Sequence, residues 1–217
     1  MIILLLTQLA TAETDTQLWL STNVHRKVVK DWRVEYTQHL RFEDNLSQVE
    51  SVMPELEVRY NPFKPLSMKI GYRYIYERTK NGDFEPAHRY HFQVSTGKKF
   101  GPVKIGYRMG YQEKHEEDEF DYTNRLRNKF SLAFDTDTDV EPVVFAETFS
   151  NIRAIPIDNS KFRVGLGLEI DVYKRMDLSL DYVYQRDFIS TEQIEHIARV
   201  KYQLKVPKKK KNTDGDP

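Results

Sequence analysis

Apolar and polar side chains alternate along most of the chain. Residues 67–76 read SMKIGYRYIY, and their two faces differ in polarity. Because successive side chains of an extended strand point to opposite sides, this alternation predicts a β-strand with an apolar face and a polar face. The same pattern returns in residues 105–111, which read IGYRMGY. The apolar positions of the first segment are Met68, Ile70, Tyr72, Tyr74 and Tyr76.

Segments of this kind recur about every nineteen residues. Strands of about ten residues joined by turns are typical of barrels that span the bacterial outer membrane, whereas strands of soluble proteins usually have five or six residues. The connections between the segments alternate between short turns and longer polar loops, which is also typical of such barrels. The expected strands are 18–25, 32–42, 49–60, 66–77, 88–97, 103–113, 122–134, 141–150, 162–171, 176–186 and 193–204.

The fold class follows from this pattern. Bacterial outer-membrane barrels have an even number of antiparallel strands, and the segments number eleven, so we expect one strand to be missed, misread or overcounted. The sequence therefore predicts an all-β protein, a single antiparallel up-and-down transmembrane β-barrel of 10 to 12 strands. The alternative is a soluble periplasmic barrel that resembles lipocalins and binds an apolar ligand in its interior.

The glycines and the aromatic residues favour the membrane barrel. The glycines of the strands lie on the polar face, where a missing side chain relieves crowding in a narrow interior but weakens a solvated surface. They are Gly71, Gly97, Gly106, Gly110, Gly165 and Gly167. Aromatic residues near strand ends resemble the interfacial girdles of membrane barrels. These are Trp19, Trp32, Tyr60, Tyr76, Tyr111 and Tyr184. We therefore expect Tyr72 to face lipid and Arg73 to face the lumen.

Composition narrows the function classes. The chain has 217 residues, enough for one domain, and 33 basic residues balance 33 acidic residues. No global basic field is present, so nucleic acid is not expected as a partner. Cysteine is absent, which excludes disulfides, thiol catalysis and cysteine-based zinc sites.

The two ends of the chain predict its location. Residues 1–12 form a short apolar run that ends in Ala-Thr-Ala, as a secretory signal peptide does. No other apolar run approaches the roughly 20 residues that a membrane-spanning helix needs. We expect a signal peptide at 1–12, the barrel at 13–205 and a disordered basic and polar tail at 206–217. The expected setting is the outer membrane of a Gram-negative bacterium. Its lipid and the barrel assembly machinery are the expected partners, and the barrel is expected to be a monomer.

The geometry of strands argues against the candidate catalytic and metal sites. His88 and His91 are three residues apart, so they point to opposite faces of a strand. His91 and Ser95 share a face but lie about 13 Å apart, too far for a nucleophile and its base. The acidic turn 135–139 resembles the start of a calcium loop, but Val140 replaces the glycine that such a loop needs. We therefore expect no catalytic residues, no metal and no cofactor. The protein is not expected to be an enzyme.

Charge on the expected inner face is segregated by sign. The basic residues are Lys69, Arg73, Arg89, Lys104, Arg108, Arg125, Arg127 and Lys129. The acidic residues of the later strands are Glu147, Glu169, Asp171, Asp177 and Asp181, together with Glu141. Opposed basic and acidic walls select small polar solutes in a wide barrel, but they meet as salt bridges in a narrow one. The expected function is structural or that of a narrow diffusion channel for small ions and polar solutes.

Four short motifs resemble a family of uncharacterised outer-membrane β-barrel proteins, domain of unknown function 2490. They are Gln17-Leu18-Trp19-Leu20, Gln38-His39-Leu40-Arg41-Phe42, Gly71-Tyr72-Arg73-Tyr74 and Phe145-Ala146-Glu147-Thr148-Phe149. The resemblance covers almost the whole chain after the expected signal peptide. It implies an outer-membrane barrel and brings no established activity with it.

Overall fold

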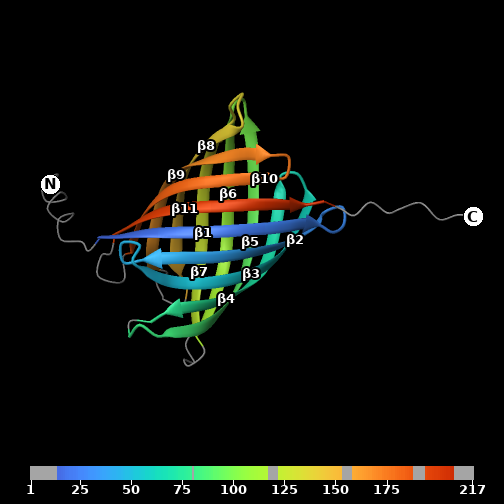
Figure 1. Cartoon of the computed structure of the whole chain (residues 1–217). Helices are drawn as coiled ribbons and strands as arrows, with labels where there is room; N and C mark the ends of the chain where they lie inside the picture. The colour runs from blue at the N-terminus through green and yellow to red at the C-terminus, as the bar shows by residue number, and fades with distance from the viewer. Residues whose placement is uncertain (1–13, 80, 117–121, 153–157, 188–193, 208–217) are drawn as a thin grey trace, which may run out of the picture.

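The described chain folds into one closed β-barrel (Figure 1). The structure is a computed structural model that describes residues 14–79, 81–116, 122–152, 158–187 and 194–207. The expected signal peptide at 1–12 and most of the expected tail at 206–217 lie outside these residues. Among the described residues, the strands are β1 (Thr14–Lys27), β2 (Trp32–Glu43), β3 (Gln48–Phe63), β4 (Leu66–Arg78), β5 (Phe84–Phe100), β6 (Val103–Glu116), β7 (Tyr122–Phe134), β8 (Val140–Asn151), β9 (Asp158–Tyr173), β10 (Met176–Asp187) and β11 (Ile194–Val206).

The barrel closes through a parallel pair. Each strand pairs antiparallel with its neighbours in sequence, and β1 pairs parallel with β11, from Thr14 opposite Ile194 to Arg26 opposite Val206. The expected all-β barrel of ten to twelve strands is confirmed, since the described residues form eleven. The expectation of an even number and of a wholly antiparallel barrel is wrong. When neighbours alternate in direction, an odd count leaves the first and last strands running the same way.

The connections define two rims. The short-turn rim holds the connections β1–β2, β3–β4, β5–β6, β7–β8 and β9–β10, and the long-loop rim holds the others. Two-residue turns join β3 to β4, β5 to β6 and β9 to β10. At the turn between β5 and β6, Gly101 has φ 56°, a left-handed value that is common in two-residue hairpin turns and that glycine adopts without strain. Most strands are longer than expected, and β5 has 17 residues where the alternation predicted 88–97, whereas β7 has the predicted bounds.

The outer surface is apolar and the inner surface carries most of the charge. Ile70 is 63% exposed and Leu166 is 60% exposed, whereas Glu147, which follows the inward alternation of β8, is 1% exposed. Tyr72 lies on the outer surface, and Arg73 pairs with Glu55 inside. The described residues contain no helix that is long and apolar enough to cross a membrane.

Part of the inner surface is apolar, which the alternation did not predict. Two buried clusters lie there, one of Met53, Ile75 and Ala87 and one of Trp19, Phe145, Val183 and Ile197. Trp19 is 9% exposed and shares the inward alternation of β1 with Gln17, so its expected place in an outer girdle is wrong. The position of Trp19 near a strand end suggested that it belongs to the outer girdle. The alternation of side chains along β1, however, places it on the inner face.

Glycines on the inner face let neighbouring side chains lie flat on the barrel wall. A Cβ at Gly165 would overlap the ring of Phe145 on the adjacent strand β8. A Cβ at Gly71 would overlap the imidazole of His91 in the same way. The predicted role of these glycines in relieving crowding is therefore borne out at both positions, where the missing side chain is replaced by a neighbour's ring.

Replacing Gly165 by Ala tests this packing. The added methyl group displaces the Phe145 ring, and we expect a loss of about 1 to 3 kcal/mol in the free energy of unfolding. The matched control is Gly110→Ala, because a Cβ at Gly110 meets its nearest atom, the Phe92 carbonyl oxygen, at 3.6 Å. Urea unfolding of the detergent-folded protein, followed by tryptophan fluorescence, measures both. Equal losses in the two variants would contradict the close approach.

Candidate functional site

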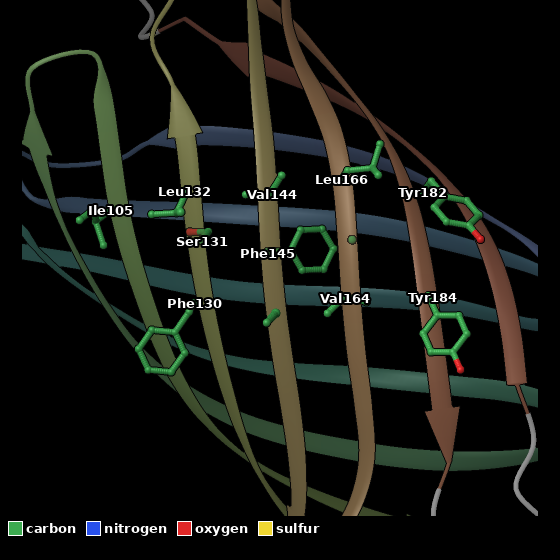
Figure 2. Close-up of a pocket in the computed structure, with 12 residues that line it drawn as sticks. Ile105, Phe130, Ser131, Leu132, Val144, Phe145, Val164, Leu166, Tyr182 and Tyr184 are labelled. Atoms are coloured by element: carbon green, nitrogen blue, oxygen red, sulfur yellow. The ribbon is translucent and has the colours of Figure 1, made fainter. Parts of the chain in front are cut away.

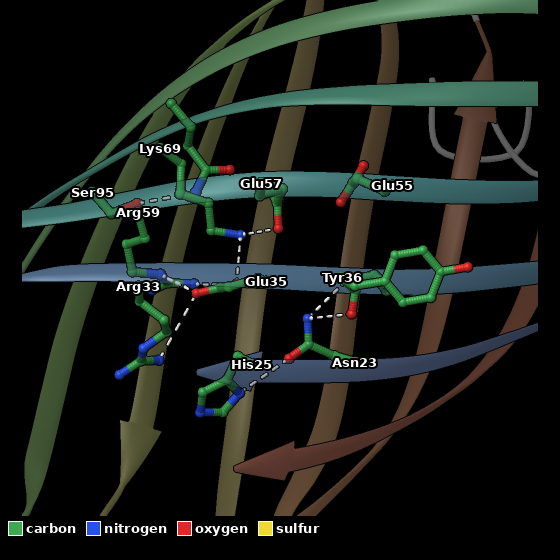
Figure 3. Close-up of polar contacts among 12 residues, drawn as sticks. Asn23, His25, Arg33, Glu35, Tyr36, Glu55, Glu57, Arg59, Lys69 and Ser95 are labelled. Carbon is green, nitrogen blue, oxygen red and sulfur yellow. Dashed lines mark hydrogen bonds and ion pairs between the residues drawn. The ribbon is translucent and has the colours of Figure 1, made fainter. Parts of the chain in front are cut away.

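A network of ion pairs covers the inner wall of β2, β3 and β4 near the short-turn rim (Figure 3). The Nε of Arg59 donates to a carboxylate oxygen of Glu35 at 2.6 Å, and a second guanidinium nitrogen donates to the other oxygen at 3.2 Å. Lys69 lies 3.4 Å from Glu35 and donates to Glu57 at 2.7 Å. The buried carboxylates of Glu35 and Glu57 are thus compensated by bases on adjacent strands, as burial of charge requires.

Gly71 allows this network to extend across β4. Glu57, Gly71 and His91 lie side by side on β3, β4 and β5. Because Gly71 has no side chain, the His91 ring reaches over it, and its Nε2 lies 3.0 Å from Glu57. His88, by contrast, bonds the hydroxyl of Tyr72 on the outer surface at 2.7 Å. The expectation that these two histidines face opposite sides is therefore confirmed.

The side chains of Glu55, Glu57 and His91 also come within reach of one cation. One ligand atom from each lies within 4.8 Å of the others. Two bases already neutralise the carboxylates, since Arg73 pairs with Glu55 and Lys69 pairs with Glu57. A metal would have to displace them, so the arrangement is better described as an ion-pair network. Sequence reasoning missed this cluster because strand spacing says nothing about contacts between strands.

A second network centres on Glu147 of β8, which is nearly inaccessible to solvent. Its carboxylate lies 3.3 Å from Arg108, 2.8 Å from Arg127 and 3.7 Å from Arg163. These arginines come from β6, β7 and β9, so one carboxylate ties four strands together. Arg163 lies on one of the strands that the sequence assigned to the acidic wall. Its positive charge therefore neutralises an acid of that same wall, Glu147.

Arginines stack on aromatic rings beside Glu147, and we call this group the arginine–aromatic cluster. It consists of Trp19, Phe145, Phe149, Arg41, Arg163 and Arg199. The guanidinium carbon of Arg163 lies 4.9 Å from the Trp19 ring and 4.5 Å from the Phe149 ring. That of Arg199 lies 4.9 Å from the Phe145 ring. Since β9 and β1 are three strands apart in the barrel, as are β11 and β8, these contacts reach across the interior.

Three of the four motifs that carry the family resemblance supply four of the six residues of this cluster. Trp19, Arg41, Phe145 and Phe149 all come from them, and Glu147 lies between the two phenylalanines. In each motif the inward residues alternate with outward ones, so the period of two could have assigned them to one face. Only the closure of the barrel shows that the motifs meet.

The predicted basic residues fall into three groups. Five of them pair with acids: Lys69, Arg73, Lys104, Arg108 and Arg127. The ammonium of Lys129 lies 3.8 Å from the centre of the Phe145 ring. Arg89 and Arg125 form no ion pair and no hydrogen bond through their side chains among the described residues. The basic side of the interior is therefore only partly neutralised.

The predicted acidic residues are mostly paired or exposed. Glu147 pairs as described, Asp181 pairs with Arg199 at 3.0 Å, and Asp177 pairs with Lys205 at 2.8 Å. Glu169 and Asp171 form no ion pair in the described part of the chain, and both are exposed near the short-turn rim. The free arginines lie nearer the long-loop rim. Among these predicted residues, the unpaired bases thus lie nearer one rim and the unpaired acids nearer the other. The ion pairs that the predicted residues form join strands no more than two apart.

Glu147→Gln tests the central ion pairs. The change leaves three arginines without their carboxylate, and we expect a loss of about 3 to 5 kcal/mol in the free energy of unfolding. Glu141→Gln is the control, because the partner of Glu141, Lys104, is 43% exposed and such a pair contributes less than about 1 kcal/mol. Urea titrations of both detergent-folded variants decide the matter. Similar small losses would show that Glu147 is not the central charge.

Two comparisons with solved structures give distant outer-membrane barrels. A loop L8 deletion mutant of OmpT, an outer membrane protein of Vibrio cholerae, is 14% identical with a TM-score of 0.46, over 76% of this chain and 57% of that one. An anion-selective porin from Comamonas acidovorans is 9% identical with a TM-score of 0.43, over 81% of this chain and 53% of that one. This chain thus spans little more than half the length of either. A comparison with curated proteins finds no match.

The family comparison covers most of the chain. A family model described as "Protein of unknown function (DUF2490)" matches residues 16–195. The matched region begins in β1 and ends in β11, so it contains every strand of the described barrel at least in part. The family suggested by the short motifs is therefore confirmed: the chain belongs to the DUF2490 family, whose function is unknown.

Proposed function

We propose that the protein is an integral β-barrel of the bacterial outer membrane, without enzymatic activity, whose interior is largely filled by side chains. The observation that carries this proposal is the inversion of the two faces. Large apolar residues such as Ile70, Phe130 and Leu166 are exposed on the outside, while buried carboxylates and their bases lie inside. A barrel surrounded by water has the opposite arrangement.

Aromatic residues near both rims support a membrane setting. At the short-turn rim, the rings of Trp32 and Tyr60 stack on the outer surface with centroids 4.5 Å apart. Towards the long-loop rim, Tyr76 stacks on Phe84 at 5.2 Å. Aromatic girdles at the two interfaces, with an apolar band between them, are the usual surface of an outer-membrane barrel.

The band between the girdles includes an apolar groove on the outer surface of β6 to β10 (Figure 2). Ala146 is the small residue at its floor, between the larger side chains of Phe130 and Val164 on the adjacent strands. Its lining suits contact with lipid chains, which accommodate an irregular apolar surface. The structure therefore supports outer-membrane lipid as the surroundings of the barrel.

The same inversion argues against a soluble carrier. A lipocalin-like barrel would need an apolar interior to hold its ligand. Here the interior of β2 to β5 contains Glu35, Glu55, Glu57 and their bases. An apolar ligand would leave these groups without water or would break their ion pairs. We therefore favour the membrane barrel, exported, folded by the barrel assembly machinery and present as a monomer.

A second candidate function is that of a narrow channel for small ions or polar solutes. The arginine–aromatic cluster fills the interior beside β8, β9, β11, β1 and β2. The opposite side, along β5 to β7, carries Arg89 and Arg125, which form no ion pairs among the described residues. A water-filled path would run along this side. Recordings of single-channel conductance in planar bilayers separate an open path from a closed interior.

Mobility on gels tests the barrel itself. A closed barrel has no edge strand from which unfolding can start, so the unheated protein should stay folded in dodecyl sulfate and migrate differently from the boiled protein. We expect two bands that interconvert on heating, with a circular dichroism spectrum of β-structure in the unheated sample. Identical migration of a sample that circular dichroism shows to be folded would contradict the proposal.

Arginine substitutions on the outer surface test the membrane setting. Leu166→Arg and Ile70→Arg should each cost roughly 2 to 4 kcal/mol in bilayers if the sites lie near the midplane. Tyr173→Arg and Phe63→Arg are matched controls, since these residues are 69% and 64% exposed but lie beside the short-turn rim, where the cost falls to about 0 to 1 kcal/mol. Urea unfolding in liposomes measures all four. Neutral behaviour of all four variants would favour a surface in water.

A further inference from the structure

Two arginines on the inner wall are not paired with any acid of the described part of the chain. Arg89 on β5 and Arg125 on β7 form no hydrogen bond or ion pair through their side chains with any described residue. The four largest electrostatic effects of other charged groups on Arg89 come from Arg73, Arg41, Arg127 and Arg125, and all of them are repulsive. An unpaired charge among like charges raises the free energy of the folded barrel, so Arg89 does not serve its stability, and Arg125 is one of the bases that repel it.

The strand register places further bases beside Arg89. Its neighbours on the inner face are Arg73 of β4 and Lys114 of β6. Arg73 is compensated by Glu55, and Lys114 by Glu77 and Glu116. The acids that contact these two neighbours are thus already engaged with other bases, and within the described part of the chain the charges of Arg89 and Arg125 are left without an ion pair.

A polar hollow lies next to these arginines. It is formed where Gly110 leaves the wall of β6 without a side chain, and its volume of about 10 Å³ is roughly that of one water-sized atom. Its polar lining residues are His91, Gln93, Arg108, Gln112 and Arg127. Gln112 lies directly opposite Arg125 in the strand register, and Arg89 precedes His91 by two residues on the same face. The free arginines therefore stand at the long-loop side of the hollow.

The distance between the two arginines fits a small ligand. Their strands are separated by β6, so the two backbones lie about 10 to 12 Å apart, given a strand spacing of about 4.8 Å and a stagger of two residues. Two arginine side chains can close this gap on one group that lies between them. Guanidinium groups bind oxyanions with paired N–H groups, and a tetrahedral anion offers oxygen atoms to both.

We propose that the inner wall of β5 to β7 binds a small oxyanion of the phosphate class between Arg89 and Arg125, with one oxygen at the hollow over Gly110. The site lies on the path of the proposed channel, and its access from outside rests on that proposed function. Binding itself needs only the folded barrel. The bound anion supplies the negative charge that the described part of the wall lacks, and the positive charge of the two arginines favours the passage of anions over cations along this side.

Inorganic phosphate is the probe for the site. We expect phosphate to raise the melting temperature of the detergent-folded wild-type protein in a saturable way, beyond the effect of potassium chloride at the same ionic strength. In the double variant Arg89→Gln/Arg125→Gln, the apparent Kd for phosphate should weaken at least tenfold. Without phosphate at low ionic strength, this variant should melt at or above the wild-type temperature, because the repulsion among the arginines is relieved.

Arg175→Gln is the matched control, since it removes the same charge from an exposed turn at the short-turn rim. Its response to phosphate should equal that of the wild type. No effect of phosphate beyond that of chloride, or an unchanged response in the double variant, would overturn the proposal. A double variant that melts well below the wild type without phosphate would also overturn it, because the arginines would then be structural.

The results that would contradict the proposed function differ from those that would contradict the anion site. If the protein binds phosphate through Arg89 and Arg125 but shows no conductance in planar bilayers, the channel is wrong and the anion site stands. If the gel shift on heating is absent in a folded sample, the barrel assignment fails whatever the phosphate response. When the protein conducts, the double variant should also shift the reversal potential in a salt gradient towards cation preference.

Discussion

Closure of the sheet by the parallel pairing of β1 with β11 is the constraint on which the other features depend. An open sheet of this length would present two edges and would have no interior. Closure turns one face of every strand inwards, so the polar residues of the alternation must satisfy one another in a limited space. The ion-pair networks, the stacked arginines and the unpaired Arg89 are consequences of that enclosure.

The enclosed space is shared between charge and apolar packing. Charged groups can be buried only when they are paired, and Glu147 meets this condition with three arginines. Aromatic rings fill the adjoining sector and offer their faces to the same arginines, which is favourable for cations that have lost water. Glycines such as Gly71 and Gly165 let rings lie along the wall, so the interior is filled without widening the barrel.

Pairing between nearby strands changes the expected role of the two charged walls. Opposed walls were expected either to act on a solute across a wide lumen or to meet as salt bridges in a narrow one. Most of the charges instead cancel against neighbours, as Lys104 does with Glu141 and Arg199 with Asp181. Among the residues that the sequence assigned to the two walls, Arg89 and Arg125 near the long-loop rim and the exposed Glu169 and Asp171 near the short-turn rim form no ion pair in the described part of the chain.

The sequence by itself determined the face of most side chains and the approximate positions of the strands, because both depend on a period of two and on local turns; it left the number of strands between ten and twelve. Tyr72 and Arg73 point to the sides that the alternation predicts, and each of the eleven expected segments overlaps a strand of the barrel. Closure with a parallel pair was not determined locally, because it depends on how strands at opposite ends of the chain meet. The partners of each charge were decided by the register between strands, which brings His91 to Glu57 over Gly71 and leaves Arg89 without an acid among the described residues. Only the tertiary structure fixes that register, since it follows from the stagger of the whole barrel and from the packing of the side chains that the barrel encloses.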